Sequence, residues 1–107
     1  MIYELRVYEV VQGKQGELYH IFETVNLPLF KELGFDVLGP WETVVGSNMP
    51  SLTYLLRWAS LADREQKFSA FYSHPKRQEA VKSGATYVHR VHSSLMKSIS
   101  FSAWPGA

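Results

Sequence analysis

The sequence contains no cysteine, which excludes disulfide bonds, thiolate nucleophiles and cysteine-ligated metal sites. It also lacks any run of about 18 apolar residues, so we expect no membrane-spanning helix. Positive and negative charges nearly balance, because the net charge is +1, and no basic run is longer than the Lys76–Arg77 pair. Nucleic-acid binding needs a clustered cationic face, so we expect neither nucleic acid nor membrane among the partners.

A secretory signal, with its basic start and apolar middle, is also missing before the first predicted strand. We therefore expect a cytoplasmic protein, and the lack of cysteine is consistent with that compartment. The 107 residues are 46% hydrophobic and 14% aromatic. A chain of this size and composition is expected to form a single domain over residues 1–107, with aromatic side chains available for a core or a self-association surface.

Apolar spacing predicts four strands and two helical regions in the order β-α-β-β-α-β. The strands are expected over residues 1–10, 35–45 and 52–58 and within 88–101. The helical regions are expected from just after Gly16 to about Leu33, and from Ser60 to about Ser83, with residues 104–107 as a tail. This order is that of the ferredoxin-like α+β sandwich, in which helices cover one face of an antiparallel sheet.

Local signals predict where these elements bend and begin. Pro28 has no N–H to donate, so we expect a kink or break near residues 26–28. Gly39–Pro40 predicts a bulge or an edge position in the second strand. Ser60 is expected to cap the second helical region, and Pro75 to open a second short helix within it. In that region we expect four side chains to be buried, namely Leu61, Phe68, Phe71 and Tyr72.

One layer of helices is too small to hide every apolar side chain of such a sheet. The side chains concerned are Ile2, Val10, Trp41, Tyr54, Leu56 and Trp58. An uncovered aromatic face of that size is typical of a binding surface. Its simplest cover is the sheet of a second copy, so we predict an isologous homodimer, a dimeric α/β barrel.

The first strand carries charge in an otherwise apolar setting. Glu4, Arg6 and Tyr8 share one of its faces, and Leu5 and Val7 lie on the other. We expect the leucine and valine to meet the helices and the polar trio to point into the barrel. The trio could form a pocket in which Glu4 is a base or acceptor, Arg6 stabilises an anion or enolate, and Tyr8 orients the ligand. The alternative interpretation is a buried ion pair that fixes strand register and dimer geometry.

Several segments in a fixed order carry a family resemblance. They are Glu4-Leu5-Arg6-Val7-Tyr8, Gly13-Lys14, Leu27-Pro28-Leu29-Phe30 before Gly34, Gly39-Pro40-Trp41 with Gly46, and the stretch from Leu56 to Glu65. From about residue 2 to 101 the chain resembles the NIPSNAP-domain family of the dimeric α/β-barrel superfamily. The resemblance implies the ferredoxin-like fold and the sheet-to-sheet dimer, but it implies no defined molecular activity.

Two positions depart from the family pattern. Where the family often has a small acidic residue before the proline of the last short helix, this chain has His74. The family also commonly has a glutamate in the final strand, where this chain is rich in serine, including Ser93.

Other residues have both a binding and a structural interpretation. Trp41, Tyr54 and Trp58 could line a ligand cavity or form a dimer core. His92 is the one residue that we nominate as an axial haem ligand. We nevertheless predict no cofactor and no metal, because His89 and His92 diverge in a strand and have no carboxylate nearby in the sequence.

Three functions are compatible with these features. We favour the binding of a small apolar or aromatic molecule in a cavity lined by the central strand, near the polar trio and Trp41. The first alternative is a cofactor-independent monooxygenase or isomerase, by analogy with other dimeric α/β-barrel proteins. The second is a structural or protein-interaction module. The charged run 63–67 and the Lys76–Arg77 pair are predicted to lie on solvated helix faces.

Overall fold

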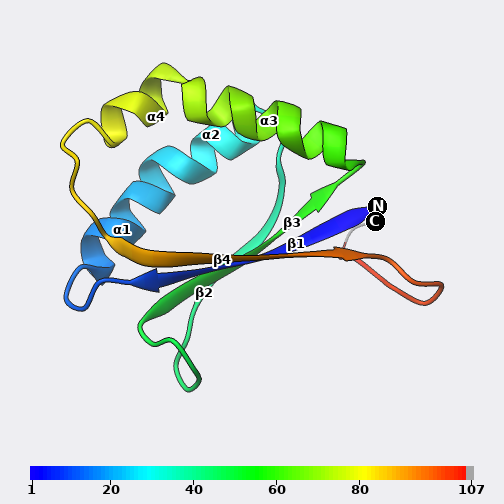
Figure 1. Cartoon of the computed structure of the whole chain (residues 1–107), viewed down its shortest axis with the longest axis horizontal. Coiled ribbons are helices and arrows are strands. Elements are labelled where there is room, and N and C mark those ends of the chain that lie inside the picture. The colour runs from blue at the N-terminus through cyan, green and yellow to red at the C-terminus, as the bar shows by residue number, and fades with distance from the viewer. Residues whose placement is uncertain (106–107) are drawn as a thin grey trace.

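The computed structural model of the chain describes residues 1–105 (Figure 1). In chain order the elements are β1 (Ile2–Val10), α1 (Gln15–Ile21), the π-helical segment η1 (Phe22–Asn26), α2 (Leu27–Glu32), β2 (Asp36–Glu42), β3 (Ser51–Trp58), α3 (Leu61–Ser73), α4 (Pro75–Ala80) and β4 (Val88–Lys97). This order and the placement of the helices on one face of the sheet confirm the predicted ferredoxin-like α+β fold. No helix within residues 1–105 is long and apolar enough to cross a membrane.

The four strands form one antiparallel sheet in the order β2-β3-β1-β4, which places β1 beside both β3 and β4. Arg6 of β1 lies opposite Tyr54 of β3 on one side and Ser93 of β4 on the other. Residues opposite each other in a sheet share a face, so these three side chains point the same way. The predicted bulge in β2 is confirmed at Gly39–Pro40, where Gly39 has a φ of +104°.

The first helical region is interrupted at the predicted place. In η1 the N–H of Leu27 bonds to the carbonyl of Phe22, five residues back, so the helix widens for one turn. Pro28 then lies in the first turn of α2, where a missing N–H is tolerated. The widened turn thus accommodates the proline without ending the helical region.

The second helical region is capped and divided as predicted. The hydroxyl of Ser60 accepts a hydrogen bond from the Asp63 N–H at 3.1 Å, and Pro75 opens α4. The expected burial of Leu61 and Tyr72 is wrong, since they are 54% and 45% exposed. Tyr72 is rotated about 100° around the helix from Phe71, at the margin of the buried stripe, and Leu61 lies in the first turn at the helix end.

The core lies between the helices and the face of the sheet that they cover. Tyr54 and Trp58 of β3 are 0% and 1% exposed. The Tyr54 ring packs edge-on against Phe22, with 5.0 Å between ring centroids, and Trp58 packs against Phe35 and Phe68 at 5.0 and 5.3 Å. Tyr54 and Trp58 were expected on the uncovered face of the sheet, and that expectation is wrong.

The two faces of β1 are likewise the reverse of the prediction. Glu4 and Arg6 are only 0% and 7% exposed, and the Arg6 guanidinium lies 5.1 Å from the ring centroid of Phe68 in α3. Leu5 and Val7 lie on the opposite face, which carries no helix (Figure 1). The period-2 pattern separates the two faces correctly. It does not reveal that α3 and β3 supply the partners of the charged face.

The C-terminal segment returns to the sheet. Trp104 packs against Tyr3 of β1, with 5.4 Å between the ring centroids. The remainder of the predicted tail, residues 106–107, lies outside the described residues.

The Ser60 cap leads to a stability prediction. Ser60→Ala removes the acceptor of the Asp63 N–H, so we expect the free energy of unfolding to fall by about 1 kcal/mol in urea titrations followed by circular dichroism. Ser69 lies exposed within the same helix, and Ser69→Ala should stay within about 0.5 kcal/mol of wild type. Equal stability of the two variants would contradict the capping role.

Candidate functional site

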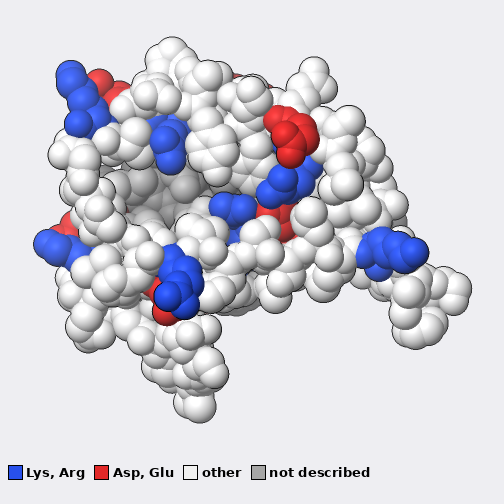
Figure 2. All heavy atoms as spheres, viewed as in Figure 1, with Lys and Arg blue, Asp and Glu red and all other residues white. Residues whose placement is uncertain are grey.

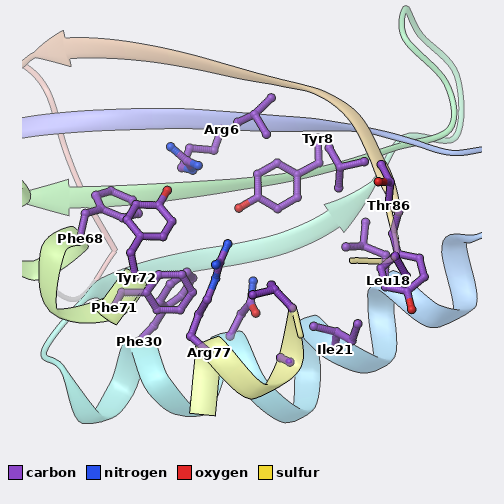
Figure 3. A pocket seen from close by; sticks show the side chains of 17 residues that line it. Arg6, Tyr8, Leu18, Ile21, Phe30, Phe68, Phe71, Tyr72, Arg77 and Thr86 are labelled. Carbon is purple, nitrogen blue, oxygen red and sulfur yellow. The ribbon is translucent and has the colours of Figure 1, made fainter. Parts of the chain in front are cut away.

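A cavity of about 320 Å³ lies between the helices and the sheet (Figure 3). Its volume is at the lower end of the range of about 300–1,000 Å³ that is typical of small-molecule pockets. Figure 2 shows the hollow on one face of the molecule, with basic atoms on its wall. The walls are mainly apolar and aromatic, formed by side chains that include Leu18, Ile21, Phe30, Phe68, Phe71 and Tyr72.

Glu4 is the buried acid behind one wall of this cavity. Its Oε1 accepts hydrogen bonds from Trp58 Nε1 at 3.0 Å and Arg64 Nε at 2.8 Å. Its Oε2 accepts from Arg6 Nη1 at 3.0 Å, from Arg64 Nη2 at 3.1 Å and from the Ser93 hydroxyl. Burial acts to raise the pKa of Glu4. The donors, with Arg64 first, outweigh it and lower the pKa to about 2.

This environment is that of a buried ion pair, the second interpretation of the polar trio. A carboxylate with a pKa of about 2 is a weak base, and its oxygens are already surrounded by donors. The prediction that the 63–67 run is entirely solvated is wrong for Arg64, which pairs with Glu4. Arg64 lies four residues before the buried Phe68 and therefore on the inward side of α3.

Arg6 joins Glu4 to two tyrosines. Its Nε donates to the Tyr54 hydroxyl at 2.9 Å, and the hydroxyls of Tyr54 and Tyr8 are 2.7 Å apart. Burial acts to lower the pKa of Arg6, but the oxygens of Tyr54, Tyr8 and Glu4 outweigh it and raise the pKa above its usual value. Burial also raises the pKa of Tyr54 well above its usual value of 10. Arg6 is therefore a cation and Tyr54 a neutral phenol at neutral pH.

Arg6 keeps donors that the protein does not use. Its Nε and Nη1 are occupied, whereas Nη2 has no hydrogen-bond partner within residues 1–105. Every fully buried side-chain nitrogen and oxygen in the same range has a partner, so Nη2 must be accessible. Arg6 and Tyr8 both line the cavity, so these N–H groups are available to a molecule within it.

Arg77 brings a second cation to the cavity from α4. Figure 3 shows its side chain reaching from the helix into the space below Tyr8. The guanidinium lies 5.1 Å from the ring centroid of Tyr72 and 5.8 Å from that of Phe71. Among the described residues no carboxylate pairs with it. The predicted solvated position is wrong for Arg77, which is half-buried.

The other predicted site residues lie in three places. Tyr54 and Trp58 are in the core behind the cavity wall, where they hold Arg6 and Glu4. Trp41 is on the edge strand β2, 50% exposed, beside a separate surface hollow.

His92 is on the uncovered face of the sheet, hydrogen-bonded to Glu9. This bond comes first among the causes that lower the pKa of Glu9. The structure thus brings Arg6 and Tyr8 to the cavity and leaves Trp41 and His92 away from it.

Three residues that complete the cavity, Arg77, Tyr87 and Val91, have no functional role in the sequence analysis. They come from α4, from the segment before β4 and from β4 itself. No local pattern connects them with β1, because their proximity results from the return of the chain across the sheet. The one usable signal is Pro75, which opens α4 and so determines where in the helix Arg77 falls.

The Glu4 network leads to a pH-dependent prediction. Glu4→Gln leaves Arg6 and Arg64 without their shared carboxylate, so we expect the free energy of unfolding at pH 7 to fall by about 3–5 kcal/mol in urea titrations. The folded-state pKa of about 2 is below the ordinary 4.5. The wild-type protein should therefore have a higher free energy of unfolding than Glu4→Gln above pH 4.5, and this difference should disappear as the pH falls towards 2.

The control for this prediction is Glu65→Gln. The exposed Glu65 carboxylate lies 3.6 Å from Arg64 Nη1, and we expect its loss to change the free energy of unfolding by less than about 0.5 kcal/mol. A wild-type advantage that stayed constant from pH 7 to pH 2 would show that the Glu4 charge does not stabilise the fold.

Solved structures with the same fold come from several bacteria. A NIPSNAP domain protein from Burkholderia xenovorans has a TM-score of 0.84 and 18% identity, with 96% of this chain and 99% of that chain covered. A NIPSNAP family protein from Agrobacterium tumefaciens has a TM-score of 0.85 and 18% identity, with 94% and 95% covered. A Nitrosomonas europaea protein suggested to be an antibiotic biosynthesis monooxygenase has a TM-score of 0.63 and 7% identity, with 92% and 99% covered.

These identities are low, so the structures show a shared fold and nothing more specific. No curated protein matches the sequence. The NIPSNAP family model matches residues 3–103, which is nearly the whole chain. The match includes the strand that carries Glu4, Arg6 and Tyr8 and the helix that carries Arg77. This chain therefore belongs to the NIPSNAP family.

Proposed function

We propose that the protein binds a small aromatic or apolar molecule in the cavity between its helices and sheet. The observation that supports this proposal is the combination of aromatic walls with a few polar groups that converge from different elements. Ligand sites typically have this composition, since apolar walls supply affinity and a few polar groups fix orientation. Arg6 and Tyr8 are the polar groups on the sheet side.

The geometry favours binding over the alternative of a cofactor-independent monooxygenase or isomerase. Such chemistry needs a group that takes a proton from the substrate, and Glu4 is unsuited to this because its pKa is about 2. The likeness to the Nitrosomonas europaea protein is one of fold and does not transfer an activity to this chain.

A cavity-filling substitution tests this proposal. Calorimetry should detect binding of 2-naphthol and 2-naphthoate to the wild-type protein. Ala80 lines the cavity, so Ala80→Trp should weaken the binding of both by at least ~10-fold because the indole occupies their space. Ala70 is exposed on α3 away from the cavity, and Ala70→Trp should leave binding unchanged. Failure of both compounds to bind the wild-type protein would disprove the proposal.

We also propose that the protein forms a homodimer through the uncovered face of its sheet. Leu38, Leu55 and Leu5 pair across β2, β3 and β1, so their side chains form one apolar row on that face. Val7 adds to the row on β1, and no helix covers it (Figure 1). A second sheet would remove these side chains from water through a self-complementary contact, with favourable burial of apolar area.

The dimer has a direct test. Light scattering should give about twice the chain mass of 12.3 kDa for the wild-type protein. Leu55→Glu places a charge in the middle of the apolar row and should give the monomer mass, because burying an unpaired carboxylate is costly. Val45 is 90% exposed outside the strands, so Val45→Glu should remain dimeric. A wild-type mass of one chain would contradict the dimer.

A further inference from the structure

We propose that the molecule bound in the cavity is an aromatic carboxylate, whose anionic group lies between Arg6 of β1 and Arg77 of α4. This inference rests on the proposed function, that a small aromatic molecule occupies the cavity. It adds the charge of that molecule and assigns Arg77 as the residue that selects it.

The charges around the cavity are unbalanced. The lining residues include two arginines and no aspartate or glutamate. Glu4 is shared between Arg6 and Arg64, and Arg64 also lies 3.6 Å from the exposed Glu65, so these four groups balance in charge. Arg77 brings an excess positive charge to the cavity, without a carboxylate partner among residues 1–105. This excess favours an anion over a neutral molecule of the same shape.

The placement of the two guanidinium groups and their free N–H donors also suits a carboxylate. They enter the cavity from opposite walls, with Tyr8 beside them (Figure 3). The Nη2 of Arg6 is accessible, and the structure gives the Arg77 side chain no hydrogen bond to residues 1–105. The guanidinium carbon of Arg77 lies 5.1 Å from the ring centroid of Tyr72 and 5.8 Å from that of Phe71, and such contacts with ring faces do not use up its N–H donors. Arginine donors in this fork-like arrangement match the two oxygens of a carboxylate.

Contacts outside the cavity hold Arg77 in position. Nδ1 of His74 accepts the N–H of Lys76 at 3.1 Å and so caps the first turn of α4. Nε2 of the same ring lies 2.8 Å from Oε2 of Glu32, which ties α4 to the end of α2. These bonds fix the start of α4, two residues before Arg77, and Figure 3 shows the Arg77 side chain directed into the cavity.

The walls indicate which anion fits. Aromatic rings surround the space, including those of Phe30, Phe68, Phe71 and Tyr72, and the volume is about 320 Å³. The aromatic rings of a ligand can pack edge-on or face-on against these side chains. A polyphosphate would leave most of its charge against apolar carbon. A carboxylate on one or two aromatic rings places its charge on the arginines and its rings on the walls.

Calorimetry with a matched pair of probes tests the inference. The probes are 2-naphthoate and 2-naphthamide, which have nearly the same shape but differ in charge. The wild-type protein should bind 2-naphthoate at least ~10-fold more tightly than 2-naphthamide. A factor of ~10 corresponds to the lower end of the free-energy gain from a hydrogen bond to a charged group. Arg77→Gln should reduce this preference to within about 3-fold and leave the affinity for 2-naphthamide unchanged. Lys76→Gln makes the same change in net charge at an exposed neighbouring position and should keep the full preference.

Each result has a distinct meaning. Equal affinities of the two probes for wild type would overturn the anion inference and leave the proposed function intact. A full preference for 2-naphthoate in folded Arg77→Gln would overturn the role of Arg77. If neither probe nor 2-naphthol binds, the proposed function fails together with this inference. If circular dichroism shows that Arg77→Gln is unfolded, Arg77→Lys is measured in its place. Lysine keeps the positive charge but lacks the two parallel N–H donors of arginine, so this variant should show an intermediate preference for 2-naphthoate.

Discussion

The buried carboxylate of Glu4 is the interaction on which the rest of the structure depends. A charged group removed from water costs several kcal/mol unless enough donors surround it. Glu4 is 0% exposed, and its donors come from four different elements. Arg6 lies on β1, Trp58 on β3, Ser93 on β4 and Arg64 on α3. All four must converge on one point, which fixes the register of three strands and holds α3 against the sheet.

The candidate site follows from the way this network uses Arg6. One guanidinium nitrogen is committed to Glu4 and another to Tyr54, so the side chain is held rigidly while its remaining donors face the cavity. Tyr54 in turn holds Tyr8, whose hydroxyl lies on the cavity wall. In the proposed binding role, a side chain supported in this way needs little reorganisation when the ligand arrives, which favours affinity. The structural ion pair and the pocket were alternatives in the sequence, yet they are two parts of one arrangement.

Two departures from the NIPSNAP family pattern have physical counterparts in the structure. His74 stands where the family often has a small acidic residue, and its Nδ1 caps α4 as a carboxylate oxygen would. The serine-rich final strand contributes the Ser93 hydroxyl, which donates to Glu4. Ser93 lies opposite Arg6 and reaches Glu4 diagonally, and an ionised carboxylate at position 93 could not donate the hydrogen bond that this hydroxyl gives to Glu4.

Local chemistry made several features predictable. The irregularity of the helical region near Pro28, the bulge at Gly39–Pro40 and the Ser60 cap each depend on one residue's backbone limits or on a side chain within a few positions. For the same reason the order of strands and helices could be predicted, together with the ferredoxin-like fold. The cavity was harder to predict from the sequence. Arg77 and Arg6 line the same cavity although they are 71 positions apart in the sequence, and no local pattern around Arg77 indicates this placement.

The sequence by itself determined the secondary structure, the fold class and the division of β1 into a charged and an apolar face. Only the tertiary structure decided which face meets the helices. Alternation along a strand is symmetric, so it separates the two faces without saying which one is covered. The decision came from Trp58, Arg64 and Ser93, which lie 54 to 89 residues from Glu4 and reach its carboxylate only after the chain has folded.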